Sequence, residues 1–598
     1  MRKNYWLINP KYKGSKTDLS EESTDRVCMG WNISDCPRFY NEIKCGDVII
    51  VAEGSHANSK VHYFGIAKNL NISEQCWTLS YSTKSINNEI SDIIRSNPTD
   101  FSGGNSANPW GPKKSIIKLG KNQSEKNLIS LLNNHYNHIM KEKLLNDCIE
   151  IIEANHNIIL TGAPGTGKTY LAKQIAQQMI FGEVKEEMTD EEKRQFNEQC
   201  GFVQFHPSYD YTDFVEGLRP VNDDNEQIGF ERKDGVFKNF CERALKTLTG
   251  NQQITNFDDV CNLFVDDILE GNLKDGLETP KQKRKFNIEI NRNRNFYAIP
   301  QTEKATRMPI TKEVIQDYLE TGKAMDWKSY VPAIGDYIKS KYKLILKEKT
   351  YNKDAKFIFI IDEINRGEIS KIFGELFFAI DPGYRGSEKC SNLRTQYANL
   401  QESVNVFDRT LQITESGNFG HFFVPENVYI IGTMNDIDRS VESMDFAFRR
   451  RFAFKEIKSN DPISISMLDS EKAWGMDKDG YSMKPDDDTI KKIKKKMESL
   501  NNVIWHKPKD DEKDEKKSIE GLSSAYHIGA SYFLKLANYR SEDKKYDDNS
   551  FDKLWEYHLN GLLREYLRGT QGIDEKMKIL EDTYKQTNAT ADDSDSDN

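Results

Sequence analysis

Residues 141–456 alternate between short apolar runs and stretches with helical spacing. Apolar runs that fit buried strands occupy 157–161, 202–205, 357–361, 428–431 and 451–454. Helical patterns separate them, and the first of these, YLAKQIAQQMI, directly follows a glycine-rich loop. Strands that alternate with helices are typical of an α/β domain with a five-stranded parallel sheet. Ligands of such sheets bind beyond the carboxyl ends of the strands, so the residues after each run are the first candidates for a site.

The first run ends in a loop that fits the phosphate-binding pattern G-x-x-x-x-G-K-[ST]. Its glycines let backbone N–H groups surround phosphate oxygens, and the following helix offers its positive N-terminal end. Lys168 is expected to reach the β- and γ-phosphates, and the Thr169 hydroxyl to bind Mg²⁺. A chance match is the alternative, but the strand before the loop and the helix after it argue against one. The predicted nucleotide-binding residues are Gly162, Ala163, Pro164, Gly165, Thr166, Gly167, Lys168, Thr169 and Tyr170.

The third apolar run delivers two adjacent carboxylates, Asp362 and Glu363. Phosphoryl transfer assisted by Mg²⁺ needs such a pair, because Asp362 can hold the water shell of the metal and Glu363 can deprotonate the attacking water. A helix N-cap is the alternative role for Asp362, and it fits a buried strand less well. Asn435 follows the fourth run and is expected to contact the γ-phosphate or its water. Asn365 completes this candidate catalytic set.

Three consecutive arginines, Arg449, Arg450 and Arg451, come at the start of the last apolar run. An arginine supplied across a subunit boundary can stabilise the charge of a phosphoryl-transfer transition state. A solvated basic patch is the alternative interpretation. Arg449 and Arg450 are the predicted fingers, because Arg451 leads directly into the strand and could be held by a structural carboxylate.

Residues 1–120 have a different pattern, with short β-branched and aromatic runs separated by Gly, Ser and Asn. This punctuation predicts a small β-rich module. Its many aromatic side chains either fill a core or, in part, line a cage for a base flipped out of a duplex. The candidate cage residues are Trp31, Tyr63 and Trp77.

The rest of the chain divides by composition. A polar, basic linker is expected at 121–140, and an inserted lobe at about 250–350 with strands at 287–299 and a helix over 311–321. The lobe could contact nucleic acid or a partner, or simply extend the packing. Residues 457–588 are rich in Lys and Glu at helical spacing and predict a helical lid, and the acidic tail 589–598 is expected to be disordered.

Composition and charge narrow the choice of function. The chain has 598 residues, a net charge of −10 and nine cysteines. The cysteines show no CxxC pair or metal-ligand spacing, so neither zinc nor a disulfide is expected. No apolar run is long enough to span a membrane and the N-terminus lacks a signal peptide, which predicts a cytoplasmic protein. Because the charge is negative overall, any contact with nucleic acid must come from a local patch.

Residues 155–455 resemble the AAA+ superfamily, and specifically the McrB-type motors of modification-dependent (type IV) restriction systems. The M-N-x-x-D-R-S signature of that family matches here at 434–440, which adds Asp438 and Arg439 to the candidate catalytic residues. The family often has small residues where this chain has Asp436 and Ile437. The segments that carry the resemblance are FVQFHPSYDYTDFVEGLRP (202–220), DEINRGEISKIFGEL (362–376), GTMNDIDRS (432–440), DFAFRRRF (445–452), YHIGASYF (526–533) and LWEYHLNGLLREYL (554–567).

The N-terminal module resembles the EVE family of PUA-like barrels. The matching segments are YWL (5–7), MGW (29–31), GDVII (46–50) and FGIA (64–67). This resemblance implies a reader that recognises a modified base extruded from a duplex.

Together the resemblances imply a homo-hexameric ring that hydrolyses GTP, or ATP as the alternative, with Mg²⁺. The ring would act on DNA that carries a modified cytosine or adenine, with a McrC-like partner that supplies the nuclease. Two other functions remain open: a nucleotide-switched sensor with a different effector, and an AAA+ remodeller of RNA or protein. Glu363 and the arginines favour turnover over a switch.

Overall fold

The computed structural model of the chain describes residues 4–8, 26–28, 42–45, 47–53, 60–71, 76–83, 86–96, 116–119, 123–222, 228–248, 253–254, 256–290, 296–302, 306–322, 324, 327–347, 354–387, 389–390, 392–401, 405–413, 418–437, 446–506, 518–541 and 543–586. It divides into two compact units, Met1–Lys143 and Leu144–Asn598. Over these described ranges, no helix is both long and apolar enough to cross a membrane.

The first unit is built on a six-stranded sheet in the order β2-β5-β4-β3-β1-β6. β1 and β3 are parallel, and the other neighbours are antiparallel. In the described part of the unit β2 and β6 form the two edges of the sheet, so its closure into a PUA-like barrel stays a prediction. The elements are β1 (Tyr5–Ile8), β2 (Arg26–Cys28), β3 (Val48–Glu53), β4 (Lys60–Asn71), β5 (Cys76–Thr83), α1 (Asn87–Ser96) and β6 (Ile116–Lys118).

The side chains of β1 alternate between two cores. Tyr5 and Leu7 pack with α1 and the first half of the next helix, α2 (Gln123–Asn155), on one face of the sheet, whereas Trp6 and Ile8 pack on the other face. The Trp6 indole donates a hydrogen bond of 2.9 Å to the buried carboxylate of Asp47. Because both faces are covered, the strand shows a continuous apolar run instead of the alternation of a half-exposed strand.

The segment expected to be a linker, 121–140, is helical. It belongs to α2 (Gln123–Asn155), of which Leu128 and Leu132 pack in the first unit and Cys148 and Ile152 in the second. Apolar residues four apart advance by about 40° around a helix at each step, or about 240° from Leu128 to Ile152. The apolar side chains therefore form a stripe that winds around α2, and no single face of the helix is apolar along its whole length.

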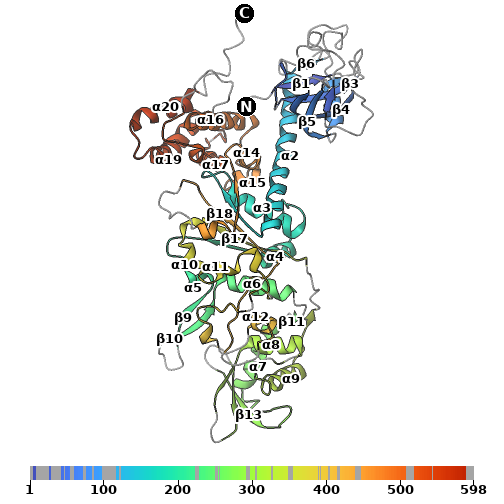
Figure 1. Cartoon of the computed structure of the whole chain (residues 1–598), viewed down its shortest axis with the longest axis vertical. Helices are drawn as coiled ribbons and strands as arrows, with labels where there is room; N and C mark the ends of the chain where they lie inside the picture. Colours follow the sequence, from blue (N-terminus) through green and yellow to red (C-terminus); the bar gives the residue numbers. More distant parts are fainter. Residues whose placement is uncertain are drawn as a thin grey trace, which may run out of the picture. The chain divides into compact units, whose positions relative to one another are not determined.

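The second unit is organised around a five-stranded, all-parallel sheet in the order β19-β7-β18-β17-β8. Figure 1 labels its strands β17 and β18. All five expected strands are present, and their bounds lie within two residues of the prediction. Since the last strand begins at Ala453, Arg451 precedes it and is not part of it. The strands are β7 (Asn157–Thr161), β8 (Cys200–Gln204), β17 (Phe357–Asp362), β18 (Val428–Thr433) and β19 (Ala453–Glu456).

Helices cover both faces of this sheet. Ile159 packs in a large aromatic core with α6 on one face, and Ile158 and Leu160 pack against α3 on the other. This double burial explains why each strand is a short, continuous apolar run. The helices around the sheet are α3 (Lys168–Phe181), α4 (Asp190–Gln199), α5 (Tyr211–Phe214), α6 (Val236–Leu248), α10 (Ile369–Phe373), α11 (Leu376–Ala379), α12 (Val406–Thr410) and α13 (Phe446–Arg449).

Asn157 connects three segments at the start of β7. Its amide group donates to the carbonyl oxygens of Ile380 at 2.8 Å and Arg451 at 2.9 Å, and its oxygen accepts from the buried guanidinium of Arg385. Arg385 also donates to the carbonyl oxygen of Val428. These groups have no access to water, so their hydrogen bonds must be made within the protein.

Asn157→Ala is expected to destabilise the second unit by about 2–4 kcal/mol, because it leaves a buried guanidinium and two carbonyl groups short of partners. Chemical denaturation followed by circular dichroism measures the change. The matched control is Asn155→Ala, since the exposed side chain of Asn155 only returns to the carbonyl of Ile151 on its own helix. If Asn157→Ala lowers the free energy of unfolding by no more than the control does, Asn157 does not have this anchoring role.

Residues 253–347 form the expected lobe, which has a hydrophobic core of its own. An antiparallel sheet in the order β12-β13-β14-β15 packs against three helices, and the expected strands and helix correspond to β13, β14 and α8. Asp317 of α8 pairs with Arg409 of α12 at 2.6 Å, which ties the lobe to the α/β core. The elements are β11 (Gln253–Ile254), α7 (Phe257–Leu269), β12 (Leu277–Glu278), β13 (Lys285–Ile290), β14 (Phe296–Pro300), β15 (Met308–Ile310), α8 (Lys312–Thr321), α9 (Val331–Lys341) and β16 (Leu346–Lys347).

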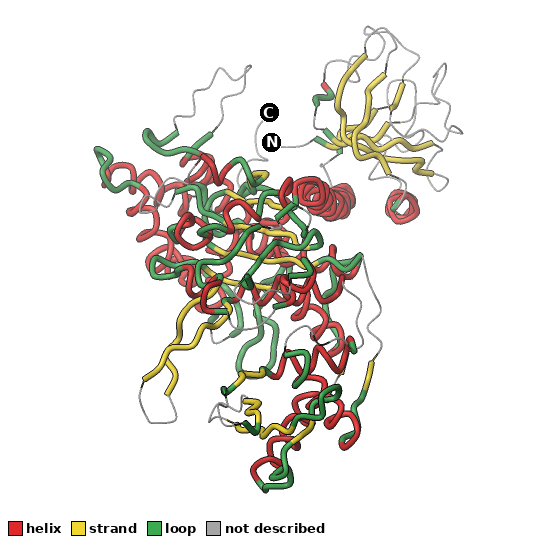
Figure 2. Tube along the Cα trace, turned by 60° about the horizontal axis from the view of Figure 1, so that its bottom comes forward, coloured by secondary structure: helices red, strands yellow, loops and turns green. Residues whose placement is uncertain are grey.

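A two-stranded hairpin, β9 (Glu216–Asn222) with β10 (Ile228–Asp234), extends from the second unit (Figure 2). Its base is held by Glu216, which is fully buried and accepts hydrogen bonds from Lys238 at 2.5 Å and Arg232 at 2.8 Å. The hairpin is therefore anchored by a charged network rather than by apolar packing alone.

The segment after β19 is helical, as expected for a lid, and builds a separate hydrophobic core. The acidic tail 589–598 lies outside the described residues. The main lid helices are α14 (Pro462–Asp469), α15 (Glu471–Trp474), α16 (Asp487–Ile504), α17 (Ala530–Leu534), α18 (Asp548–Leu554), α19 (Asn560–Tyr566) and α20 (Ile573–Gln586).

Candidate functional site

The glycine-rich loop connects β7 to α3 as the sequence predicts. Gly162 has φ 141°, and a β-carbon there would lie 2.2 Å from the carbonyl oxygen of Ile457, so no other residue fits. Gly167 has φ 87° and immediately precedes the first residue of α3, Lys168. The loop thus ends at a helix N-terminus, where backbone N–H groups and the helix dipole favour phosphate.

The Lys168 ammonium is almost fully buried at this loop. It donates to the carbonyl oxygens of Gly162 at 3.0 Å and Ala163 at 2.8 Å, and to the side-chain oxygen of Asn435 at 2.8 Å. These contacts hold a positive charge over the loop, between the end of β7 and the end of β18. A triphosphate chain bound by the loop would meet this charge at its β- and γ-phosphates.

Oxygen ligands suited to Mg²⁺ meet beside Lys168. The Asp362 carboxylate accepts hydrogen bonds of 2.7 Å from the hydroxyls of Thr169 and Thr433. Hydroxyl and carboxylate oxygens are the donors that Mg²⁺ prefers, and this ion usually keeps several waters rather than a full protein cage. Within the described ranges, no group of three or more His, Cys, Asp or Glu side chains is arranged to hold a metal ion. The donor set therefore fits Mg²⁺ that is shared with phosphates.

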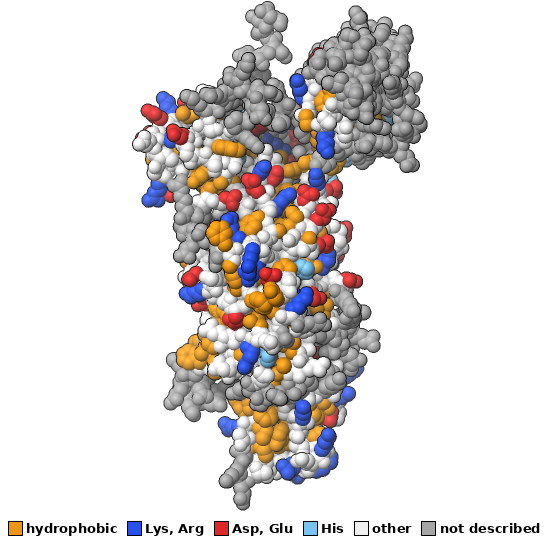
Figure 3. All heavy atoms as spheres, in the orientation of Figure 1, with side chains coloured by type: hydrophobic (Ala, Val, Ile, Leu, Met, Phe, Trp, Pro, Cys, Tyr) orange, Lys and Arg blue, Asp and Glu red, His pale blue; other side chains and the backbone are white. Residues whose placement is uncertain are grey.

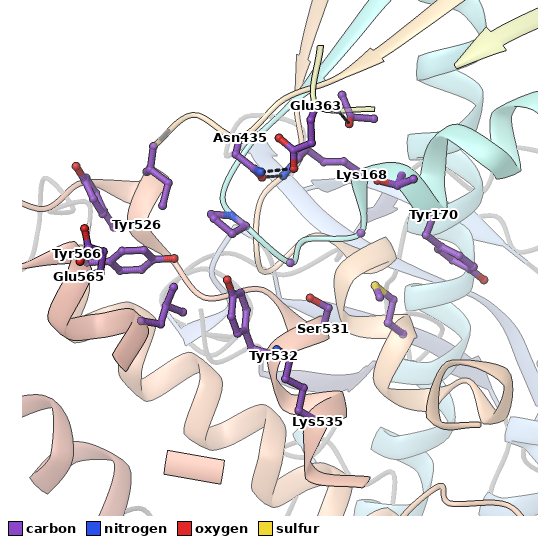
Figure 4. A pocket seen from close by; sticks show the side chains of 18 of the residues that line it. Lys168, Tyr170, Glu363, Asn435, Tyr526, Ser531, Tyr532, Lys535, Glu565 and Tyr566 are labelled. Carbon is purple, nitrogen blue, oxygen red and sulfur yellow. Dashed lines mark hydrogen bonds between the residues drawn. The ribbon is translucent and has the colours of Figure 1, made fainter. Parts of the chain in front are cut away.

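Glu363 stands on a turn after β17 with φ 53° and ψ 45°, a left-handed conformation that is unusual for a side chain of this kind. One carboxylate oxygen accepts a hydrogen bond of 2.7 Å from the amide of Asn435, and the other lies 3.3 Å from the Arg366 guanidinium. The buried Asn365 donates a weak 3.5 Å bond to the Asn435 carbonyl. Lys168, Asn435 and Glu363 thus form one connected chain (Figure 4).

The lid closes against the glycine loop through its backbone. The N–H groups of Gly529 and Ser531 each donate a 3.1 Å bond, to the carbonyl oxygens of Pro164 and Gly165 respectively. These bonds fix the YHIGASYF segment at the mouth of the site. A cavity of about 1020 Å³ lies between loop and lid, which is ample for a nucleoside triphosphate.

Several cavity residues were not among the sequence candidates. Figure 4 shows that the lid supplies aromatic and charged side chains opposite Glu363 and Lys168. The segments that contain them were assigned to the lid, but helical spacing alone does not tell which side chains face the cavity. Partial burial raises the pKa of Tyr170, whose side chain also lines the cavity. The additional lid residues are Tyr526, Tyr532, Lys535, Glu565, Tyr566 and Arg568.

The arginines at the end of α13 differ from one another. Arg451 is 8% exposed, lies 3.9 Å from Asp381 and covers the Phe377 ring at 4.5 Å. Arg449 and Arg450 are exposed and do not line the cavity of their own chain. The structure therefore agrees with a structural role for Arg451. Asp438 and Arg439 lie outside the described residues.

Two family models match this part of the chain. Residues 140–201, which include the glycine loop, match the family described as Novel STAND NTPase 3. Residues 290–452, which include β17, β18 and the arginines, match the AAA domain of the dynein-related subfamily. The second match begins inside the lobe.

Two curated relatives come from restriction systems. The "Type IV methyl-directed restriction enzyme EcoKMcrB subunit" of Escherichia coli (strain K12) is 26% identical over 394 residues, which are 66% of this chain and 50% of that protein. The "Type II restriction enzyme BsuMI component YdiS" of Bacillus subtilis (strain 168) is 23% identical over 304 residues, 50% of this chain and 57% of that protein. Over its AAA domain the chain is thus similar to subunits of restriction systems, the McrB subunit among them. The matched region spans only about half the length of either relative.

The AAA+ domain accounts for the site described above. Its parallel sheet, glycine loop and paired carboxylates are those of an α/β P-loop NTPase that uses nucleotide with Mg²⁺. Both family matches fall within residues 140–452, so the EVE-like identity of the N-terminal module rests on its sequence resemblance.

The structure describes two of the three residues predicted to line a base cage. Trp31 lies outside the described residues. Tyr63 and Trp77 are only 4% and 5% exposed and pack with Trp6 in the core on one face of the sheet. The structure thus gives Tyr63 and Trp77 the core role that was the alternative interpretation, and a cage that uses them as accessible walls is not supported.

Proposed function

We propose that this chain is the nucleotide-hydrolysing subunit of a modification-dependent DNA restriction system that serves in anti-phage defence. The observation that carries the proposal is the convergence of Lys168, Asn435, Glu363 and the Asp362–Thr169 pair at one cavity. The similarity to the McrB subunit supports the biological context.

In the proposed reaction each side chain has a defined task. The Lys168 ammonium holds the β- and γ-phosphates, and Glu363 takes a proton from the attacking water while Asn435 orients it. The Thr169 hydroxyl and the Asp362 carboxylate hold Mg²⁺, which when bound neutralises charge on the phosphates. GTP is the favoured nucleotide, and ATP is the alternative.

The rest of the machine is proposed from the resemblance and from the exposed arginines. The chain acts in the cytoplasm as a homo-hexameric ring, in which Arg449 or Arg450 of one subunit serves the nucleotide site of the next. The N-terminal module recognises DNA with a modified cytosine or adenine, and a McrC-like partner carries the nuclease. Nucleotide turnover activates that partner or moves the ring towards it.

The purified chain is expected to hydrolyse GTP with a higher kcat/KM than ATP, and to support cleavage of modified DNA only with GTP and the nuclease subunit present. Phosphate release and gel analysis of modified and unmodified plasmids measure the two activities. Efficient GTP hydrolysis without cleavage of any modified plasmid would favour the sensor or remodeller alternatives. Equal cleavage of modified and unmodified plasmids would contradict the proposal that the N-terminal module recognises a modified base.

A further inference from the structure

The sheet of the inserted lobe is strongly basic in an otherwise acidic chain. Residues 277–310 contain eight Lys and Arg but three Asp and Glu, whereas the whole chain has a net charge of −10. Helix α7 of the same lobe carries four Asp and no Lys or Arg. The excess of positive over negative side chains in the lobe thus lies in the sheet region, and such a local patch is what an acidic protein needs to contact a polyanion.

Half of those eight cations lie in the turn before β13 and at the first residue of that strand. Residues 281–285, with the sequence KQKRK, are all exposed. Figure 3 shows Lys and Arg side chains gathered at the end of the lobe where β13 lies. We call Lys281, Lys283, Arg284 and Lys285 the basic turn.

The basic turn has a defined backbone. Thr279, which is 3% exposed, donates from its N–H to the Arg284 carbonyl at 3.0 Å, and its carbonyl accepts from the Lys283 N–H at 3.1 Å. Its hydroxyl accepts a third bond, of 3.0 Å, from the Arg284 N–H. Lys283 adopts φ 52°, which closes the turn. The four cationic side chains therefore project from a fixed scaffold, so little backbone entropy is lost when they bind a ligand.

None of the four side chains of the basic turn forms an ion pair within the described part of the chain. Their neighbour Arg307 behaves differently, since it pairs with Glu289 at 2.5 Å and lies over the Tyr297 ring at 5.9 Å. Four solvated cations within five residues repel one another and contribute nothing visible to the packing of the lobe. A ligand with regularly spaced negative charges would relieve that repulsion.

The sheet beside the turn has a polar outer face. Its inner face packs on the helices of the lobe, and its outer face carries exposed Lys285 and Asn287 on β13, with Gln301 hydrogen-bonded to Asn287 at 2.7 Å. Such side chains are the usual donors to phosphate and sugar oxygens of nucleic acids. The outer face extends the basic turn into a surface of mixed cations and amides.

We infer that the basic turn and the adjoining outer face bind the phosphate backbone of duplex DNA. This inference rests on the proposed function, which already brings DNA to the protein through a different module. Because phosphate contacts carry no sequence information, the lobe would hold modified and unmodified DNA equally and leave the choice of base to the reader.

The test replaces all four residues of the basic turn by Gln in the full chain and measures binding of one duplex with and without a modified cytosine, across a range of salt concentrations. Removing one phosphate contact makes the slope of log K against log salt shallower by about 0.9, so a decrease of about 2–4 is expected. The same decrease is expected for both duplexes. The matched control replaces the exposed lid residues Lys472, Lys478, Lys491 and Arg564 by Gln and should leave the slope unchanged.

Thermal unfolding that matches the wild type shows that the lobe variant is folded. An unchanged slope in that variant or an equal decrease in the lid control would overturn the inference. The same salt series with a duplex RNA of the same sequence is measured in parallel, and a decrease seen only with the RNA would overturn it too. If the wild-type chain binds both duplexes without preference, the N-terminal module does not recognise the modified base, but the salt dependence still tests phosphate binding by the lobe. A wild-type chain that binds neither duplex would refute both.

Discussion

Glu363→Gln is expected to bind nucleotide with nearly wild-type affinity and to hydrolyse it at least about 10²-fold more slowly. The substitution keeps the shape of the side chain and the oxygen that accepts from Asn435 at 2.7 Å, but it removes the carboxylate that would take the proton of the attacking water. Nucleotide affinity by calorimetry and turnover by phosphate release separate binding from chemistry.

Two further variants sharpen this result. Glu368→Gln removes an exposed carboxylate five residues later in the same segment and should leave turnover unchanged. Lys168→Ala removes the buried ammonium at the loop and should weaken binding as well as turnover. Wild-type turnover in Glu363→Gln would mean that another group activates the water, whereas a large loss of affinity would mean that Glu363 chiefly holds the site together.

The carboxylates and the loop could be predicted because their context is local. Each follows an apolar run of about five residues, and the rule that parallel strands end at a common edge brings them together. The hydrogen bond between Lys168 and Asn435 joins residues 267 positions apart, and that between Thr169 and Asp362 joins residues 193 apart. The sequence predicts that these residues lie close together only through the order of the strands, because neither residue carries a signal that identifies its partner.

Other features had no comparable signal. Arg366 reaches Glu363 from a short 3₁₀ turn, whose geometry depends on the left-handed backbone at Glu363. The cavity side chains of the lid, such as Tyr566, lie on helices that are amphipathic in any case, so spacing predicts their helices and not their orientation.

The N-terminal module shows a second limit of pattern reading. Its strands are buried on both faces, so aromatic residues such as Tyr63 and Trp77 are equally suited by sequence to a core and to a cage. Only their burial in the folded unit distinguishes the two roles. The first part of helix α2 was taken for a linker for a related reason, because its apolar stripe winds from one unit into the other.

The connected chain of Lys168, Asn435 and Glu363 also suggests how the site responds to nucleotide. Asn435 contacts both the phosphate-binding ammonium and the proposed base. A γ-phosphate that engages Lys168 competes with the 2.8 Å bond to Asn435, and a change at Asn435 passes directly to Glu363. The position of Glu363 would then depend on whether the phosphate site is occupied.

Arg449→Ala or Arg450→Ala is expected to lower turnover by roughly 10³-fold or more while nucleotide affinity in the isolated subunit stays nearly the same. Both guanidinium groups are exposed and outside the cavity of their own chain, so they are available to the nucleotide site of a neighbouring subunit. Arg449 lies over the Phe454 ring at 5.3 Å, at the edge strand of the sheet. The matched control is Arg243→Ala, which removes an exposed arginine that lies over Phe240 at 5.5 Å on α6 and should leave turnover unchanged.

Mixing the finger variant with Glu363→Gln protein provides the decisive measurement. Each protein alone is inactive, but a mixed ring contains interfaces that pair an intact Glu363 with an intact arginine from the neighbour. Partial recovery of turnover is therefore expected, with its maximum near equal proportions of the two proteins. Native mass spectrometry verifies that mixed rings form. If verified mixed rings stay inactive, catalysis is completed within one chain and the exposed arginines have another role.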